Sequence, residues 1–238
     1  MILREARITI KKRNALLKSF IEHLTAKQAG KMAGVSRNTA NLYFNHFRQS
    51  IFEHYVRAPR FSGEVEIDEC TFGKGAKRSK YDARVRSGMS IEEWRTYLKK
   101  TKLKRATQNV LVFGIQRRGG DVYTHIIKDR RRETLIPIIH LVVEGGSIIL
   151  SDMHKSYDIL QEDGYEHQQI NHSQGFVNKK GIHIGTIESF WSSAKDHFRR
   201  FRGIARRTYP LHLKECEFRW NNRGDEKLML KTLKRWAF

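Results

Sequence analysis

Apolar residues recur at helical spacing through the first 57 residues of the chain. Five of them repeat at intervals of three and four residues, as the buried face of a helix requires: Leu16, Leu17, Phe20, Ile21 and Leu24. Thr25 is a good N-cap for a short second helix, and Ser36 for a third helix that runs to about Tyr55. Gly34 lies between them and permits a tight turn. The pattern predicts a small all-α domain over residues 1–57.

A helix, a short helix, a glycine turn and a capped helix form the layout of a helix-turn-helix. The residues expected to pack inward are Val35, Ala40, Tyr43 or Phe44, and Phe47. Arg37, Asn38 and Asn41 would then face the major groove of DNA, where Arg reads guanine and Asn reads adenine. The alternative is a plain three-helix unit that serves only for packing.

The periodicity changes after Pro59. Residues 64–69 alternate between acidic and β-branched side chains, which predicts a strand. Further strands are predicted at 109–119 and 121–129, joined as a hairpin at Gly119-Gly120, at 147–152 and near 167–170. Helices are predicted over 130–144, 156–162, 186–201, 211–219 and 226–236. This order predicts an α/β domain with a mixed sheet over residues 58–238.

Residues 73–108 fit neither period, and we interpret them as an insertion between the first two strands. The stretch is basic and contains glycines. It would either become ordered on DNA or remain a solvated basic loop, and the sequence leaves both interpretations open.

The charge of the chain points to a polyanionic partner. The 238 residues include 46 Lys and Arg against 25 Asp and Glu, a formal net charge of +21. This balance argues against an ordinary small-molecule enzyme, because Lys and Arg neutralise phosphates and release condensed counterions. The two cysteines, Cys70 and Cys216, are too few for a disulfide scaffold or a cysteine zinc site. No apolar run is long enough for a membrane span, so no membrane partner is expected.

Three acidic residues are placed to bind divalent metals. Asp68 and Asp152 each lie near the C-terminal end of a predicted strand, and such ends face one crevice in a sheet with parallel neighbours. Glu188 opens a helix after the last strand, with thirty-five residues between it and Asp152. Carboxylate oxygens suit Mg²⁺, and no His/Cys set in the sequence favours zinc. A pair of such ions would activate a water or hydroxyl for phosphodiester displacement.

An ordered series of motifs extends this pattern over nearly the whole chain. The segments are SRNTANLYFNHFRQSI, GEVEIDECTFGKG, VFGIQRRGGDVYTHII, TLIPII, ILSDMHKSYDIL, INHSQGF, HIGTIESFWSSAKDHFRRFRGI and LHLKECEFRWNNR. In this order the chain resembles the DDE transposases of the bacterial insertion-sequence family related to the eukaryotic Merlin elements.

The resemblance implies an RNase H-like catalytic domain that cuts the ends of a mobile element and joins the 3′-hydroxyl to target DNA. It assigns Asp68, Asp152 and Glu188 as catalytic metal ligands for two Mg²⁺ or Mn²⁺ ions, and Lys195 as a contact to the DNA backbone near the scissile phosphate. The implied partners are double-stranded DNA, both as transposon ends and as target, and further copies of the chain in a homodimer or larger assembly. The expected location is the cytoplasm of a bacterial host, in association with the nucleoid.

Neighbouring acids offer alternatives to the first ligand. Glu69 would point to the opposite face of the strand from Asp68, while Glu66 shares the face of Asp68 but lies one repeat earlier. Glu188 could equally be a solvated helix residue when it is considered alone.

Several other side chains accompany the three acids. His172 would either orient the scissile strand or a metal-bound water, or make a structural hydrogen bond. Trp191 is expected to pack in the core rather than stack on a base. Arg199, Arg200 and Arg202 follow the acidic helix closely, and contact with the DNA backbone is favoured over a solvated basic face.

Two rival functions share much of this pattern. An RNase H-like nuclease or resolvase would cut branched DNA without joining it. A domesticated regulator would bind DNA without catalysis, although the complete set of acids with Lys195 favours an enzyme.

Overall fold

A computed structural model describes residues 8–73, 110–170, 185–201 and 204–238. It divides the chain into two compact units, described separately below: Met1–Arg57 with Phe218–Phe238, and Ala58–Glu217. The boundary after residue 57 coincides with the change in periodicity. The second boundary falls inside a helix near the C-terminus and differs from the predicted organisation, which extended the α/β domain to residue 238.

The first unit contains the predicted N-terminal helices. They are α1 (Ile10–Ile21), α2 (Ala26–Ala33) and α3 (Arg37–Tyr55). Thr25 caps α2 through a reciprocal capping box with Gln28, and the Ser36 side chain accepts the Thr39 N–H at the start of α3. Gly34 ends α2 with φ at 63°, a left-handed conformation that favours glycine.

The core of the first unit extends beyond the N-terminal helices. The rings of Phe44 and Phe47 from α3 pack edge-on against Phe20 of α1, with centroids 5.2 and 5.5 Å apart. The same core contains one face of α8 (Glu226–Ala237). The sequence analysis assigned this helix to the α/β domain. An amphipathic pattern shows that a helix has a buried face, but it does not show which core that face packs against.

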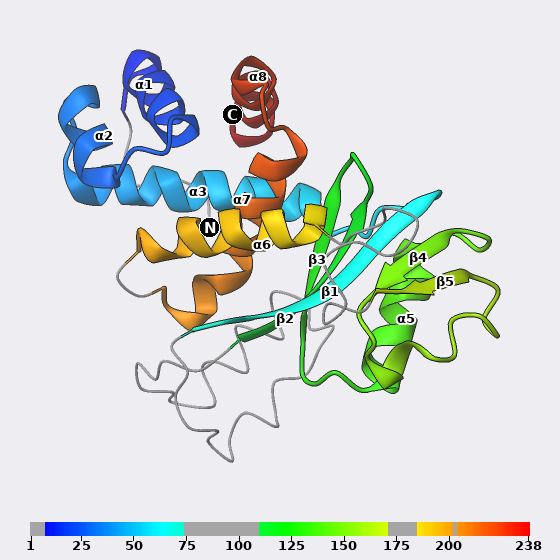
Figure 1. The fold of residues 1–238 in the computed structure, drawn as a ribbon. Helices are drawn as coiled ribbons and strands as arrows, with labels where there is room; N and C mark the ends of the chain where they lie inside the picture. The colour runs from blue at the N-terminus through cyan, green and yellow to red at the C-terminus, as the bar shows by residue number, and fades with distance from the viewer. Residues whose placement is uncertain (1–7, 74–109, 171–184, 202–203) are drawn as a thin grey trace. The chain divides into compact units, whose positions relative to one another are not determined.

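The second unit is built on a five-stranded sheet in the order β3-β2-β1-β4-β5 (Figure 1). The strands are β1 (Glu64–Phe72), β2 (Val110–Arg117), β3 (Val122–Ile127), β4 (Ile148–Ser151) and β5 (Glu166–Gln169). β1, β2 and β3 form an antiparallel meander, while β4 and β5 run parallel to β1. This topology confirms the predicted RNase H-like mixed sheet.

Helices flank both faces of the sheet. α5 (Arg132–Val142) packs one face and contributes Leu135, Ile139 and Val142 to a core with the β1 and β2 side chains. α6 (Gly185–Arg199) packs against β1 and β2, and α7 (Tyr209–Asn221) follows it.

One predicted helix is much shorter than expected. The segment predicted as a helix over 156–162 forms a single 3₁₀ turn, Lys155–Tyr157, followed by further turns. The connection between β4 and β5 is short, and a helix of so few residues does not repay the cost of nucleation. Buried Tyr157 and Leu160 at a spacing of three suit the turns as well as a helix.

The structure does not describe the predicted basic insertion. The insertion predicted at 73–108 falls outside the described residues, except for Gly73.

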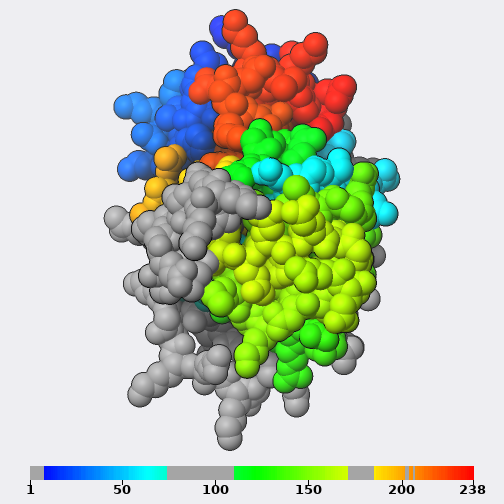
Figure 2. Space-filling model, turned by 45° about the vertical axis from the view of Figure 1, so that its right-hand side comes forward, coloured from blue at the N-terminus to red at the C-terminus, as the bar shows by residue number. Residues whose placement is uncertain are grey.

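The β4–β5 region, yellow-green in Figure 2, lies at the surface of the second unit. Within the described part of the chain, no helix combines the length and apolar character needed to cross a membrane.

Candidate active site

Two of the predicted carboxylates lie at one edge of the sheet. β1 and β4 are parallel neighbours, and Glu66 of β1 is level with Leu150 of β4. Asp68 and Asp152 each follow two residues later, so the register places them side by side just beyond the last β1–β4 pair. Asp152 directly follows the end of β4, whereas Asp68 lies in the middle of β1, which continues to Phe72 paired with β2. The structure therefore brings the two aspartates together, although β1 extends three residues beyond the predicted strand 64–69 and Asp68 is not at its end.

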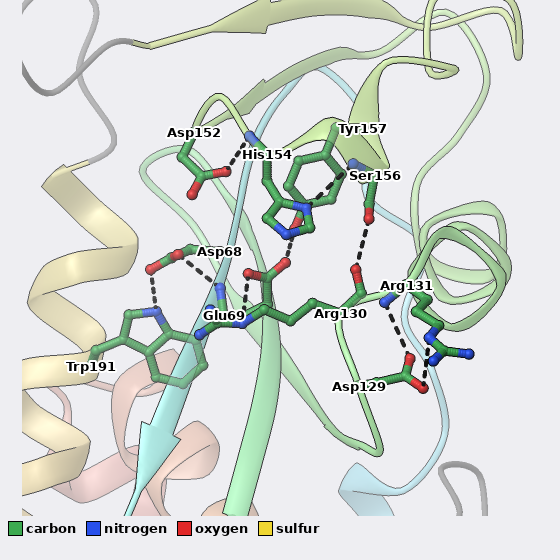
Figure 3. A network of polar contacts seen from close by, with 10 residues as sticks. All are labelled: Asp68, Glu69, Asp129, Arg130, Arg131, Asp152, His154, Ser156, Tyr157 and Trp191. Carbon is green, nitrogen blue, oxygen red and sulfur yellow. Dashed lines mark hydrogen bonds and ion pairs between the residues drawn. The ribbon is translucent and has the colours of Figure 1, made fainter. Parts of the chain in front are cut away.

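Two donors hold the Asp68 carboxylate (Figure 3). The indole Nε1 of Trp191 donates to Asp68 Oδ2 at 2.9 Å, and the Glu69 backbone N–H donates to Oδ1 at 2.8 Å. Burial raises the pKa of Asp68 to about 6, and the negative charges of Glu69 and Asp152 add to the rise. A fixed carboxylate among other acids is suited to bind a cation, because the cation offsets their repulsion.

A turn after β4 orients Asp152. The His154 backbone N–H donates to Asp152 Oδ1 at 3.1 Å, and the Ser156 N–H donates to His154 Nδ1 at 3.3 Å. On the neighbouring strand β5, His167 Nε2 lies 2.8 Å from the Ser151 hydroxyl. These contacts fix the backbone that carries the second aspartate.

Glu69 points to the opposite face of β1 from Asp68, toward Tyr157 and Arg130, although it lies close enough to both aspartates for the charges to interact. Its carboxylate accepts a hydrogen bond from the Tyr157 hydroxyl, and its Oε2 lies 3.4 Å from Arg130 Nε (Figure 3). Burial raises the pKa of Glu69, and the contacts with Tyr157 and Arg130 oppose the rise. Since a cation and a hydroxyl already occupy Glu69, Asp68 remains the better candidate ligand on β1.

Glu66 is fully buried, at 0% exposure, under the N-terminus of α6. Its Oε2 accepts the Ile187 N–H at 2.9 Å, and Thr186 also hydrogen-bonds to the carboxylate. Burial raises the pKa of Glu66, and these hydrogen bonds oppose the rise. A carboxylate at this position accepts hydrogen bonds from backbone N–H groups in the first turn of α6, and its negative charge interacts favourably with the positive end of the helix dipole. Glu66 is therefore a cap that ties α6 to β1, which separates it from the metal-ligand candidates.

The capped helix carries the third predicted acid. Glu188 lies on the first turn of α6, one turn before Trp191, whose indole contacts Asp68. The Glu188 side chain is exposed. Among the described residues, its carboxylate does not join Asp68 and Asp152 in a group of ligand atoms within 4.8 Å of one another.

Lys195 lies near the same edge of β1. Burial raises the pKa of the Cys70 thiol, and the nearby Lys195 ammonium opposes that rise. Cys70 follows Asp68 by two residues and so shares its face of β1. A cation on α6 thus lies beside the strand end that carries the first aspartate.

Comparison with known proteins now adds to this geometry. Residues 60–221, more than half of the chain, match the family described as the ISXO2-like transposase domain. The chain belongs to the ISXO2-like transposase family. An uncharacterized transposase-like protein of Haemophilus influenzae is 41% identical to this transposase over 101 residues, which make up 42% of this chain and 81% of that protein. Both matches confirm the resemblance to insertion-sequence transposases.

Solved structures of Mos1 transposase are also similar to the chain. A pre-cleavage transpososome gives a TM-score of 0.36, and a paired-end complex with the left transposon end gives 0.38. Each comparison covers 100% of this chain and 79% of the Mos1 chain at 12% identity. Scores of this size are too low to establish a shared fold, so the fold of the transposase rests on its own sheet topology.

The structure places the remaining predicted residues in different settings. On α3 of the transposase, the side chains of Arg37, Asn38 and Asn41 are exposed. Arg199 and Arg200 are exposed near the end of α6, where Arg199 forms an ion pair with Asp196. The predictions for His172 and Arg202 fall outside the described residues.

Three residues that position the site were not singled out as functional from the sequence. Trp191 is buried, at 4% exposure, as its apolar spacing predicted, but its indole N–H also holds Asp68. Glu66 was considered only as a competing ligand, and Gly114 not at all. The sequence held one signal for the role of Glu66. An acid two residues before Asp68, on a strand face that is expected to be buried, requires a hydrogen-bonding or charged partner.

Gly114 lets α6 approach the sheet. It is paired with Asp68 across β1 and β2, and a Cβ at this position would lie 2.5 Å from Trp191 Cζ2. For Gly114→Ala we expect a loss of about 1–3 kcal/mol in the free energy of unfolding, because a buried ring and its helix must move. Urea unfolding measures this loss.

Gly145→Ala is the matched control for Gly114→Ala. A Cβ there meets no atom within 4 Å, and Gly145 has no positive φ. Its unfolding free energy should stay within about 0.5 kcal/mol of the wild type. Equal stability of the two variants would contradict the role given to Gly114.

Proposed function

We propose that this transposase binds the terminal inverted repeats of a mobile element, cleaves the DNA ends and joins their 3′-hydroxyls to target DNA. One observation carries the proposal: Asp68 and Asp152 lie level where the pairing of the parallel strands β1 and β4 stops, beside a helix that is capped from β1 and carries Glu188. Membership of a transposase family supports phosphodiester chemistry at this edge.

The acids suit divalent metals. Carboxylate oxygens are the ligands preferred by Mg²⁺ and Mn²⁺, and the raised pKa of Asp68 reflects burial among like charges that a cation would relieve. Asp68, Asp152 and Glu188 would hold two such ions. The ions would supply activation of a water or 3′-hydroxyl nucleophile and stabilisation of the leaving oxygen.

The protein groups around the acids have separate tasks in this proposal. Trp191 orients Asp68, and the turn at His154 orients Asp152. Glu66 holds the first turn of α6, so that Glu188 can approach the aspartates when their charge is neutralised. Lys195 is placed to bind a DNA phosphate beside the same edge.

A strand-transfer assay separates transposition from the rival activities. Pre-cut transposon ends with free 3′-hydroxyls are incubated with plasmid DNA, Mg²⁺ and the full chain. Joined products support the proposal. Cleavage of uncut ends without any joining would instead establish a nuclease or resolvase, and binding without either reaction would establish a regulator.

In this proposal, the exposed face of α3 recognises the sequence of the inverted repeats. For Arg37→Ala and Asn41→Ala we expect a loss of about 1–3 kcal/mol in binding to the cognate end, because each removes a bidentate contact to a base. Binding to unrelated DNA should change much less. Fluorescence anisotropy with cognate and scrambled duplexes at fixed salt measures both affinities.

Lys18→Ala serves as the control for the α3 variants. Lys18 is an exposed cation of the same unit and pairs with Glu22 on α1 at 3.6 Å. Its loss should leave the preference for cognate over scrambled DNA unchanged. An unchanged preference in Arg37→Ala and Asn41→Ala as well would remove α3 from sequence recognition.

The joining of two ends in one reaction requires more than one catalytic site. We therefore propose that two or more copies of the transposase assemble on paired ends. The mass of the complex with cognate ends, measured by light scattering, tests this: a single chain that carries out coupled joining would contradict it.

A further inference from the structure

A second group of potential ligands lies away from the aspartates, between α6 and α7. His197 is on the last turns of α6, and His212 and Glu215 are three residues apart on α7. One nitrogen from each imidazole and one carboxylate oxygen all lie within 4.8 Å of one another. No sequence motif marks this group as a zinc site, because its residues meet only through the packing of two helices.

The spacing within this group is close to that of a metal centre. His197 Nε2 lies 3.4 Å from Glu215 Oε2, and His212 Nδ1 lies 3.9 Å from the same oxygen. Ordinary N–H···O hydrogen bonds are shorter, about 2.7–3.2 Å. Ligands bound to Zn²⁺ at about 2.0–2.2 Å in a tetrahedron are separated by roughly 3.3–3.6 Å. The His197–Glu215 separation falls within this range and the His212–Glu215 separation exceeds it by about 0.3 Å, so a small cation could enter after the ligand atoms move slightly closer together.

The surroundings favour a closed site over an exposed ion pair. His197, His212 and Glu215 are 7%, 6% and 1% exposed. The ring of Phe201 packs beside both imidazoles, with centroids 5.1 Å from His197 and 4.6 Å from His212. Burial beside an aromatic ring lowers the local dielectric constant, which strengthens the electrostatic attraction between a cation and its ligands.

We propose that His197, His212 and Glu215 bind one Zn²⁺ ion, with a water molecule as the fourth ligand and a structural role in holding α6 against α7. Two imidazole nitrogens and one carboxylate oxygen are a zinc-type donor set, and imidazole ligands disfavour Mg²⁺. The site differs in chemistry from the all-oxygen edge at Asp68, and it does not depend on the transposition chemistry. Glu66 anchors one end of α6, and the zinc site would anchor the other.

Metal analysis of the full chain tests the proposal. Protein purified without chelator and dialysed against metal-free buffer should retain about one equivalent of zinc per chain. After chelation, added Co²⁺ should produce the intense visible absorption of a tetrahedral site. Zinc should also raise the thermal unfolding midpoint of the stripped protein, because a ligand that binds only the folded state stabilises it.

Variants assign the metal to these residues. His212→Gln and Glu215→Gln should each lose the retained zinc and the cobalt absorption. His125→Gln changes another histidine of the same unit and should retain the zinc and the cobalt absorption. Asp68→Asn, which disables the proposed carboxylate metal site, should retain them as well. Where a cluster variant fails to fold, the wild-type zinc content and cobalt spectrum still decide. Wild-type protein without bound zinc or tetrahedral cobalt absorption would overturn the proposal, as would full metal retention by His212→Gln.

Discussion

Asp68→Asn, Asp152→Asn and Glu188→Gln should each reduce Mg²⁺-dependent cleavage of a transposon end by on the order of 10³-fold or more. Each change removes a negatively charged oxygen from the proposed two-metal site. When several residues act as one catalytic unit, the loss of any one of them removes most of the activity of the enzyme. The measurement is the initial rate of cleavage of a labelled end duplex at saturating protein.

The same variants should still bind the end. Base recognition is assigned to α3 in the first unit, which none of these substitutions alters. A gel-shift titration with cognate duplex in the absence of Mg²⁺ therefore should give an affinity close to that of the wild type. Loss of binding in parallel with loss of cleavage would indicate misfolding rather than a catalytic defect.

Glu64→Gln is the control for the acid series. Glu64 lies on the same strand as Asp68, is exposed, and pairs with Arg118 at 2.7 Å. Because a surface pair of this kind contributes little to stability, this variant should cleave at the wild-type rate. Full Mg²⁺-dependent cutting by any one of the three acid variants would remove that residue from the proposed site.

The local sequence pattern was sufficient for most of the framework. Alternation in β1, the hairpin at Gly119-Gly120 and the apolar run of β4 each depend on neighbours within a few residues, and all three form as predicted. Asp68 and Asp152 could be brought together because parallel neighbouring strands run toward the same edge of a sheet, a rule that needs topology but no side-chain detail. The sequence did not show that β1 continues past Asp68 to Phe72.

Contacts between distant segments could not be predicted in the same way. The pairing of α8 with the N-terminal helices depends on tertiary packing, which the periodicity of an amphipathic helix does not encode. The capping of α6 by Glu66 and the meeting of His197 with His212 likewise join elements far apart in the chain. Both follow from how α6 lies on its neighbours, and no short motif records that arrangement.

The outer edge of the sheet shows another such long-range contact. β3 is the outermost of the described strands, so one side of its backbone has no strand neighbour within the described part of the chain. The Thr124 N–H donates to Glu217 Oε1 at 2.8 Å, and Lys214 Nζ donates to the Thr124 carbonyl at 2.9 Å. Lys214 and Glu217 are themselves paired at 2.6 Å on α7. A buried ion pair thus satisfies the Thr124 N–H and carbonyl groups on this side of β3.

Glu217→Ala should lower the free energy of unfolding by about 3–5 kcal/mol, because it leaves Lys214 buried without its partner and the Thr124 N–H without an acceptor. Burial already raises the pKa of Glu217 and lowers that of Lys214, and their mutual attraction opposes both shifts. Removal of the carboxylate therefore favours a neutral Lys214. Urea unfolding followed by circular dichroism measures the loss.

Glu217→Gln separates the hydrogen bond from the charge. Its side-chain oxygen can still accept the Thr124 N–H, so the edge of β3 remains covered and only the ion pair is lost. We expect this variant to be less stable than the wild type but more stable than Glu217→Ala. Because surface substitutions rarely change stability by more than about 0.5 kcal/mol, a change that small in Glu217→Ala would show that α7 does not seal this edge.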